Sequence, residues 1–153
     1  MNALEILVER PACYELVIAT SRLPADSSVR ARPPGRVRRY ANGAATLHIG
    51  PGRWLLVGRA IERTAAAVAA GRVRGGSLVD VRAKWLRLSV MGPEAQNCLS
   101  RFLNVAGVLR DRDCAPVSIL DCPTLLARCE RGFELWTSRS WGTWLHDLLT
   151  RSR

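Results

Sequence analysis

The hydrophobic pattern of the chain changes within one short stretch, LRLSVMGPEAQNCLSRFLN, between Leu86 and Asn104. Apolar and polar residues alternate from Leu86 to Val90, which predicts a strand with one buried face. After Gly92 the apolar positions recur at spacings of three and four, which predicts an amphipathic helix that covers the strand. Because a first helical turn tolerates the missing N–H of a proline, we interpret Gly92-Pro93 as the start of that helix rather than as a ligand site.

The same two signals occur on the N-terminal side of this stretch. Residues 46–49 and 54–57 are expected to form strands joined by a turn at Gly50-Pro51-Gly52, since glycine and proline supply turn conformations. Residues 60–70 are strong helix formers, and Gly71 is expected to end that helix. The next apolar run, residues 77–90, contains the alternating strand.

The last third of the chain repeats the pattern. Residues 116–122, 123–130 and 133–138 are expected to form three short strands. Ser138 is expected to cap a helix over residues 140–152 that carries Trp141 and Trp144 along one side.

The first 44 residues are less regular. Residues 13–20 form a predicted strand, whereas residues 22–39 are rich in Pro, Ser and Arg and are expected to form a loop or an extended arm. We therefore expect an N-terminal segment over residues 1–44 with an Arg/Pro-rich arm, and a domain over residues 45–153, together in one compact domain.

Three successive strand-strand-helix blocks, at residues 46–70, 77–104 and 116–150, define the expected architecture. Short runs of strands followed by helices predict an α+β fold of mostly antiparallel sheets with the helices packed on one face. No apolar run approaches the ~20 residues of a membrane helix, and the N-terminus lacks the pattern of a signal peptide. We therefore expect a cytoplasmic protein.

Charge is the strongest compositional signal. The chain has 23 basic and 13 acidic residues, a formal net charge of +10. Such an excess favours an anionic partner, which leaves nucleic acid, a phosphorylated ligand and an acidic protein surface open. The five cysteines have no C-x-x-C spacing, so we expect buried thiols rather than a zinc site or a disulfide framework.

The sequence contains no recognisable catalytic constellation. His48 and His146 lack triad partners, and adjacent helical positions would point His146 and Asp147 in different directions. The glycine-rich segments do not have the spacing of phosphate-binding loops. Asp80 lies between apolar neighbours, which favours a structural role for its carboxylate.

Tryptophan and arginine are the residues that point to an interaction surface. Both types are enriched among residues that dominate the affinity of protein interfaces. We expect the arginines of the arm and the two tryptophans of the last helix to contact a partner. These interface candidates are Arg36, Arg38, Arg39, Trp141 and Trp144.

Three motifs follow one another along the chain: Leu78-Val79-Asp80, Gly92-Pro93-Glu94-Ala95, and Phe133 to Ser140 followed by Trp144-Leu145. In this order and spacing they resemble the gamma subunit of heterotetrameric sarcosine oxidase. The resemblance spans about residues 45–149. It implies a fold related to the folate-binding aminomethyltransferase, the glycine cleavage T-protein.

The resemblance also implies a function. The chain would be a non-catalytic gamma-type subunit of a hetero-oligomeric flavoenzyme that oxidatively demethylates an N-methyl amine and transfers the one-carbon unit to tetrahydrofolate. FAD or FMN, NAD and tetrahydrofolate would lie on larger partner subunits, and this chain would bind no cofactor or metal itself. Two alternatives stay open: a basic nucleic-acid-binding protein, and a small stand-alone folate-binding protein.

Overall fold

The computed structural model describes residues 4–18, 35–41, 43–58, 66, 68, 70–71 and 75–152. The chain forms two compact units. The terminal unit consists of Met1–Arg10 and Lys84–Arg153, and the inserted unit consists of Pro11–Ala83. The N-terminal decapeptide and the C-terminal half therefore build one unit together, with the other unit inserted between them in the sequence.

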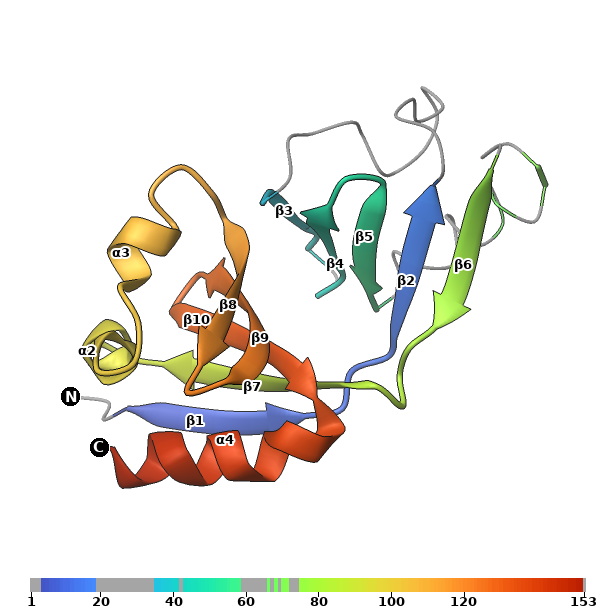
Figure 1. Cartoon of the computed structure of the whole chain (residues 1–153). Helices are drawn as coiled ribbons and strands as arrows, with labels where there is room; N and C mark the ends of the chain where they lie inside the picture. Colours follow the sequence, from blue (N-terminus) through green and yellow to red (C-terminus); the bar gives the residue numbers. More distant parts are fainter. Residues whose placement is uncertain are drawn as a thin grey trace. The chain divides into compact units, whose positions relative to one another are not determined.

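The terminal unit is built on a five-stranded sheet with the order β1-β7-β10-β9-β8 (Figure 1). The strands are β1 (Glu5–Glu9), β7 (Trp85–Met91), β8 (Cys114–Ile119), β9 (Cys122–Cys129) and β10 (Gly132–Ser138). Each of the four pairings is antiparallel. Strand β7 lies between the first strand of the chain and the last one.

The helices of the terminal unit are α2 (Ala95–Ser100), α3 (Val105–Val108) and α4 (Arg139–Arg151). Alternate residues of β7, represented by the fully buried Leu88, share one hydrophobic core with residues of all three helices, including Leu99, Val105 and Leu145. The switch from alternating to helical spacing after Met91 therefore has the predicted result, because α2 buries its apolar residues in the core that β7 begins.

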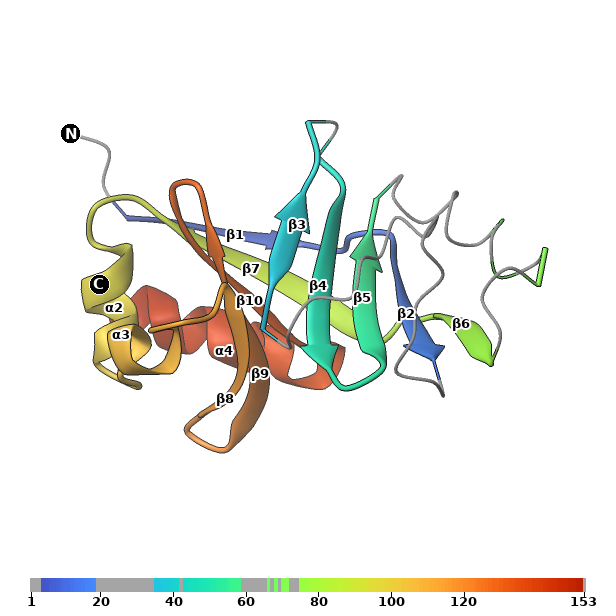
Figure 2. The ribbon, with the colours of Figure 1, turned by 90° about the horizontal axis from the view of Figure 1, so that it is seen from above.

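The inserted unit contains a second five-stranded sheet, with the order β3-β4-β5-β2-β6 (Figure 2). Its strands are β2 (Cys13–Ile18), β3 (Val37–Arg39), β4 (Ala45–Gly50), β5 (Arg53–Val57) and β6 (Gly76–Asp80). All of the pairings are antiparallel. On one face of this sheet Leu16, Trp54 and Leu56 form a buried cluster, against which Tyr14 and Leu78 pack.

Most of the predicted elements are confirmed. The mostly antiparallel, two-sheet character of the fold agrees with the α+β prediction, and the hairpin at residues 46–57, the strand before Gly92 and α4 lie where the pattern placed them. Three strands were missed: β1, the short β3 inside the predicted arm, and β6, which had been merged with β7 into one run. The predicted capping bond at α4 is wrong, since the Ser138 hydroxyl makes no cap and lies 2.7 Å from the Ser140 hydroxyl.

The units also divide the chain at positions other than the expected 44/45 boundary. Strands from both sides of that boundary pair in one sheet, β2 with β5 and β3 with β4. Backbone hydrogen bonding across residue 44 therefore joins the expected N-terminal segment to the rest of the inserted unit. The predicted helix over residues 60–70 lies largely outside the described residues, although Ala66 and Val68 are helical. Of the predicted arm over residues 22–39, residues 22–34 also lie outside them.

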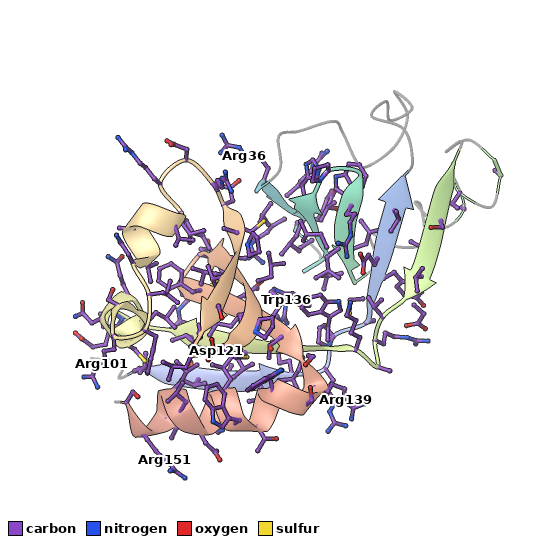
Figure 3. The ribbon with its side chains drawn as sticks, viewed as in Figure 1. Arg36, Arg101, Asp121, Trp136, Arg139 and Arg151 are labelled. Atoms are coloured by element: carbon purple, nitrogen blue, oxygen red, sulfur yellow. The ribbon has the colours of Figure 1, made fainter. Side chains whose placement is uncertain are left out.

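The turn between β8 and β9 contains a strained residue. Leu120 has a φ of 45° and Asp121 a φ of 67°. Two consecutive positive φ values are typical of a type I′ hairpin turn, which favours Asn and Gly. The leucine side chain is 57% exposed, so burial offsets little of this strain. Figure 3 labels Asp121 at this turn.

Replacing Leu120 with asparagine should stabilise the terminal unit. We expect Leu120→Asn to raise the free energy of unfolding by about 1 kcal/mol, because an L-residue other than Gly, Asn or Asp adopts the left-handed region at a cost of roughly 1–2 kcal/mol. Urea denaturation followed by tryptophan fluorescence measures the change. Leu120→Ala is the matched control, since it keeps the strained backbone and removes only the exposed side chain. If Leu120→Asn is less stable than the wild type, the left-handed conformation of Leu120 is not a source of strain.

Candidate functional site

Helix α4 presents an aromatic pair to solvent. Its buried residues, including Gly142 and Leu145, face the sheet of the terminal unit. A Cβ atom on Gly142 would lie 2.9 Å from Leu86 Cδ2, so the helix packs closely on β7. Trp141 and Trp144 remain 36% and 39% exposed. Their rings are in edge-to-face contact, with centroids 5.5 Å apart.

This exposure separates the two residues from other tryptophans of the chain. Trp54 is 5% exposed and Trp136 is fully buried, so both serve the cores around them. A tryptophan with an exposed ring offers a large apolar area with few rotatable bonds, which suits it to protein interfaces. The expected contact of Trp141 and Trp144 with a partner stays a prediction.

Charged groups border the aromatic pair. Arg139 and Arg151 lie at the two ends of α4 and point away from the sheet (Figure 3). His146 Nδ1 lies 3.5 Å from Asp147 Oδ1. The expectation that these neighbours point in different directions is therefore wrong, because their side chains bend toward each other at the exposed surface of the helix. The His–Asp contact is local and includes no nucleophile.

The arginine candidates lie in the inserted unit. Arg36 precedes β3, and Arg38 and Arg39 belong to it, and all three are exposed. The guanidinium of Arg38 lies over the ring of Tyr40, with Cζ 5.0 Å from the ring centroid. Because strand residues alternate between faces, Arg38 and Tyr40 share one face of the sheet and Arg39 lies on the other. The structure thus groups the arginines in one unit and the tryptophan pair in the other unit.

Arg87 forms an ionic and aromatic link across three strands of the terminal unit. It lies opposite Glu9 of β1 and opposite Trp136 of β10 in the strand register. Its Nε donates to Glu9 Oε2 at 2.9 Å, and its Nη1 lies 3.6 Å from Glu134 Oε1. Its guanidinium lies over the Trp136 ring, with Cζ 5.5 Å from the centroid.

Sequence reasoning missed this link. Arg87 was visible as the polar residue of an alternating strand, but its partners come from β1 and β10. The Trp136 indole donates to Glu134 Oε2 at 3.3 Å, so the buried carboxylate also accepts from the strand that carries it. The arrangement stabilises the sheet, since it brings a cation, an aromatic face and two carboxylates together across adjacent strands.

Substitution of Arg87 tests whether its side chain and that of Glu134 stabilise the sheet together. We expect Arg87→Met to lower the free energy of unfolding by about 3 kcal/mol, because removal of one partner from a largely buried ion pair deprives the other of its counterion. Adding Glu134→Gln to that variant should restore part of the loss, whereas Glu134→Gln alone should destabilise. A double-mutant cycle in urea measures the coupling. Strictly additive effects would show that the two groups act independently.

Asp80 is held by a neighbouring arginine at the end of β6. Arg82 Nε donates to both carboxylate oxygens, at 3.0 and 2.9 Å, and the Arg82 backbone N–H donates to Oδ1 at 3.0 Å. The Arg82 side-chain hydrogen bond, followed by the backbone bond, lowers the pKa of the Asp80 carboxyl below its usual range. Asp80 therefore has a local structural contact, in agreement with its expected role.

The Asp80 carboxyl should titrate below its ordinary value. In a carboxyl-detected NMR titration we expect a midpoint under ~3.9 in the wild type and a return toward ~3.9 in Arg82→Gln. Because the folded pKa is the lower one, the contribution of this contact to stability is present above ~pH 4 and is lost as the pH falls through the folded value. A wild-type midpoint at the ordinary value would contradict the contact.

The cysteines and histidines form no site of their own in the part of the chain that the structure describes. All five cysteines are thiols, four of them buried. His48 stacks on Trp54 with ring centroids 4.7 Å apart. No group of three or more His, Cys, Asp or Glu residues arranged for a metal ion occurs among the described residues. No described helix is long and apolar enough to cross a membrane.

The fold, with its two antiparallel sheets, has a counterpart among solved structures. A chain of heterotetrameric sarcosine oxidase from Corynebacterium sp. U-96, solved in complex with pyrrole 2-carboxylate, is similar with a TM-score of 0.72 and 21% sequence identity. The similarity covers 97% of this chain and 85% of that chain. No protein-family model and no curated protein matches the sequence. The sequence-based resemblance to a sarcosine oxidase subunit is thus confirmed at the level of the fold.

Proposed function

We propose that the chain is a gamma-type, non-catalytic subunit of a sarcosine-oxidase-like hetero-oligomer. The complex would oxidatively demethylate an N-methyl amine and transfer the one-carbon unit to tetrahydrofolate. FAD or FMN, NAD and tetrahydrofolate are assigned to larger flavoprotein subunits, and the complex to the cytoplasm. The aminomethyltransferase-like relationship of the fold, with helices on one sheet face, belongs to the same proposal.

The observation that carries this proposal is the extent of the structural similarity. The match to the sarcosine oxidase chain includes 97% of this chain, so it extends over both units. The three sequence motifs of the resemblance fall on defined elements: Leu78-Val79-Asp80 ends β6, Gly92-Pro93-Glu94-Ala95 leads into α2, and Phe133 to Ser140 spans β10 and the start of α4. Sequence order and three-dimensional fold therefore support the same assignment.

The exposed aromatic pair supports a role in assembly. Trp141 and Trp144 lie on the final helix with their rings in contact, and Arg36, Arg38 and Arg39 supply exposed cations. In the proposed complex these five residues contact the larger subunits. An edge-to-face aromatic pair that is already formed loses little conformational freedom on binding, which favours association.

Purification of the tagged chain from its native host tests the proposal. We expect a larger subunit with the visible absorbance of flavin to co-purify in fixed proportion, and the isolated complex to oxidise an N-methyl amine such as sarcosine. The isolated chain should show no heat of binding with tetrahydrofolate in calorimetry. A lone monomer without flavin would contradict the subunit assignment, and saturable folate binding to the monomer would favour the stand-alone folate protein.

Variants of the aromatic pair locate the contact. Trp141→Ala/Trp144→Ala should weaken association with the flavoprotein by at least about 30-fold, because a dominant interface residue contributes about 2 kcal/mol or more. Leu7→Ala/Val8→Ala is the control, since these side chains are 42% and 45% exposed on β1 of the same unit. Equal weakening by both pairs would remove α4 from the proposed interface.

A further inference from the structure

The positive charge of the chain is concentrated in one of its two units. The inserted unit has twelve basic and four acidic residues, which gives a net charge of +8. The terminal unit has eleven basic and nine acidic residues, which gives +2. Most of the excess of basic residues therefore belongs to residues 11–83.

Ion pairing within the inserted unit leaves this charge in place. Its two acidic residues in the described segments are each held by an arginine of the same unit: Glu15 accepts from Arg53 Nε at 2.8 Å, and Asp80 accepts from Arg82. Basic residues outnumber acidic ones by eight in this unit, so the unit keeps a net charge of +8 whichever of its residues pair with one another. The surplus favours an anionic partner outside the unit.

Three exposed arginines of this unit lie along one edge of the sheet. β3 is an edge strand, and Arg36, Arg38 and Arg39 are exposed at it. Alternation places Arg36 and Arg38 on the face of Tyr40, and the Tyr40 ring holds the guanidinium of Arg38 at 5.0 Å. A guanidinium held against an aromatic ring keeps its planar edge available for a bidentate contact with a carboxylate.

The aromatic residues of the unit distinguish between anionic partners. Binding of single-stranded nucleic acid relies on aromatic rings that stack with bases. The unit contains three Phe, Tyr or Trp residues, all of them described: Trp54 is buried, and Tyr14 and Tyr40 each have an arginine over the ring. Because Trp54 is buried and each tyrosine already has an arginine over its ring, the surface offers little aromatic area for stacking with bases, which favours carboxylates over nucleotides.

We propose that the β3 edge of the inserted unit, through Arg36, Arg38 and Arg39, binds an Asp/Glu-rich surface of a partner protein. The proposal rests on the proposed function in one respect, that this partner is a larger subunit of the complex. Charge complementarity of this kind steers association, so the association rate falls as salt screens the charges. We therefore expect the partner surface that contacts β3 to be rich in Asp and Glu.

A binding experiment on the full isolated chain tests the acidic specificity. The probe is fluorescent poly-L-glutamate, titrated at ~50 mM and at ~150 mM salt, where screening differs. Arg38→Glu/Arg39→Glu should weaken binding of the probe at least about tenfold, whereas Arg110→Glu/Arg112→Glu should weaken it less than about threefold. Both variants reduce the long-range attraction between chain and probe equally, but only the first removes arginines that pair directly with the glutamates of the probe. The control makes the same change in net charge at exposed positions of the terminal unit.

Equal weakening by the two pairs would overturn the proposal, since net charge alone would then explain binding. A mixed-sequence single-stranded DNA of matched charge that binds more tightly than poly-L-glutamate at ~150 mM salt, and loses this affinity in the β3 variant, would also overturn it in favour of nucleic acid. Circular dichroism checks the fold, and Arg38→Gln/Arg39→Gln gives a milder variant with the same expected direction.

The co-purified complex separates this proposal from the proposed function. If a flavoprotein co-purifies and the β3 variant releases it at lower salt than the control variant does, both stand. If it co-purifies but the two variants release it at the same salt concentration, the acidic β3 contact is wrong and the subunit assignment stands. If no flavoprotein co-purifies while poly-L-glutamate binding remains specific to β3, the subunit assignment fails and the acidic specificity stands.

Discussion

The terminal unit depends on the pairing of β1 with β7, to which Arg87 adds a side-chain contact between the two strands. Arg87 and Glu9 are 78 residues apart in the sequence and lie opposite each other in the sheet. The same guanidinium contacts the Trp136 ring of β10, so one side chain spans the three strands β1, β7 and β10. Because Ile6 of β1 belongs to the main hydrophobic core, this pairing also completes the burial of that core.

The two units differ in the residues that they contain. The terminal unit is nearly balanced in charge, has three helices in its described core and carries the exposed aromatic pair. The inserted unit is strongly basic, and its described acidic residues are held by its own arginines. The exposed aromatic pair and most of the surplus positive charge therefore belong to separate stretches of the sequence.

The sequence predicts those parts whose patterns are local. The hairpin at residues 46–57, the strand and helix around Gly92 and the amphipathic α4 each have a clear period, and each is confirmed. β1 lacks alternation, because four of its five residues are exposed at a sheet edge. β3 has only three residues and lies in an arginine-rich segment, where no apolar period marks it.

The same distinction applies to the candidate site. The spacing of Trp141 and Trp144 predicts a shared helical flank, since i and i+3 are neighbours on a helix, and their rings are in contact. The Arg87 link has no local signal, because strand register alone brings Glu9, Arg87 and Trp136 together. The division of charge between the units likewise becomes visible only when the contacts show which residues form each unit.

Insertion of one unit between β1 and β7 has a consequence for biosynthesis. β1 is made first, but its partner strand ends at Met91, after the whole of residues 11–83. At ~5–20 residues per second, the ribosome would need several seconds to a quarter of a minute to supply that partner. During this interval residues 5–9 lack the partner strand of their own chain, and unpaired backbone groups of this kind are open to pairing with other chains. Glu5 and Glu9 at its two ends place like charges on every nascent copy, so the two glutamates oppose self-association before the sheet exists.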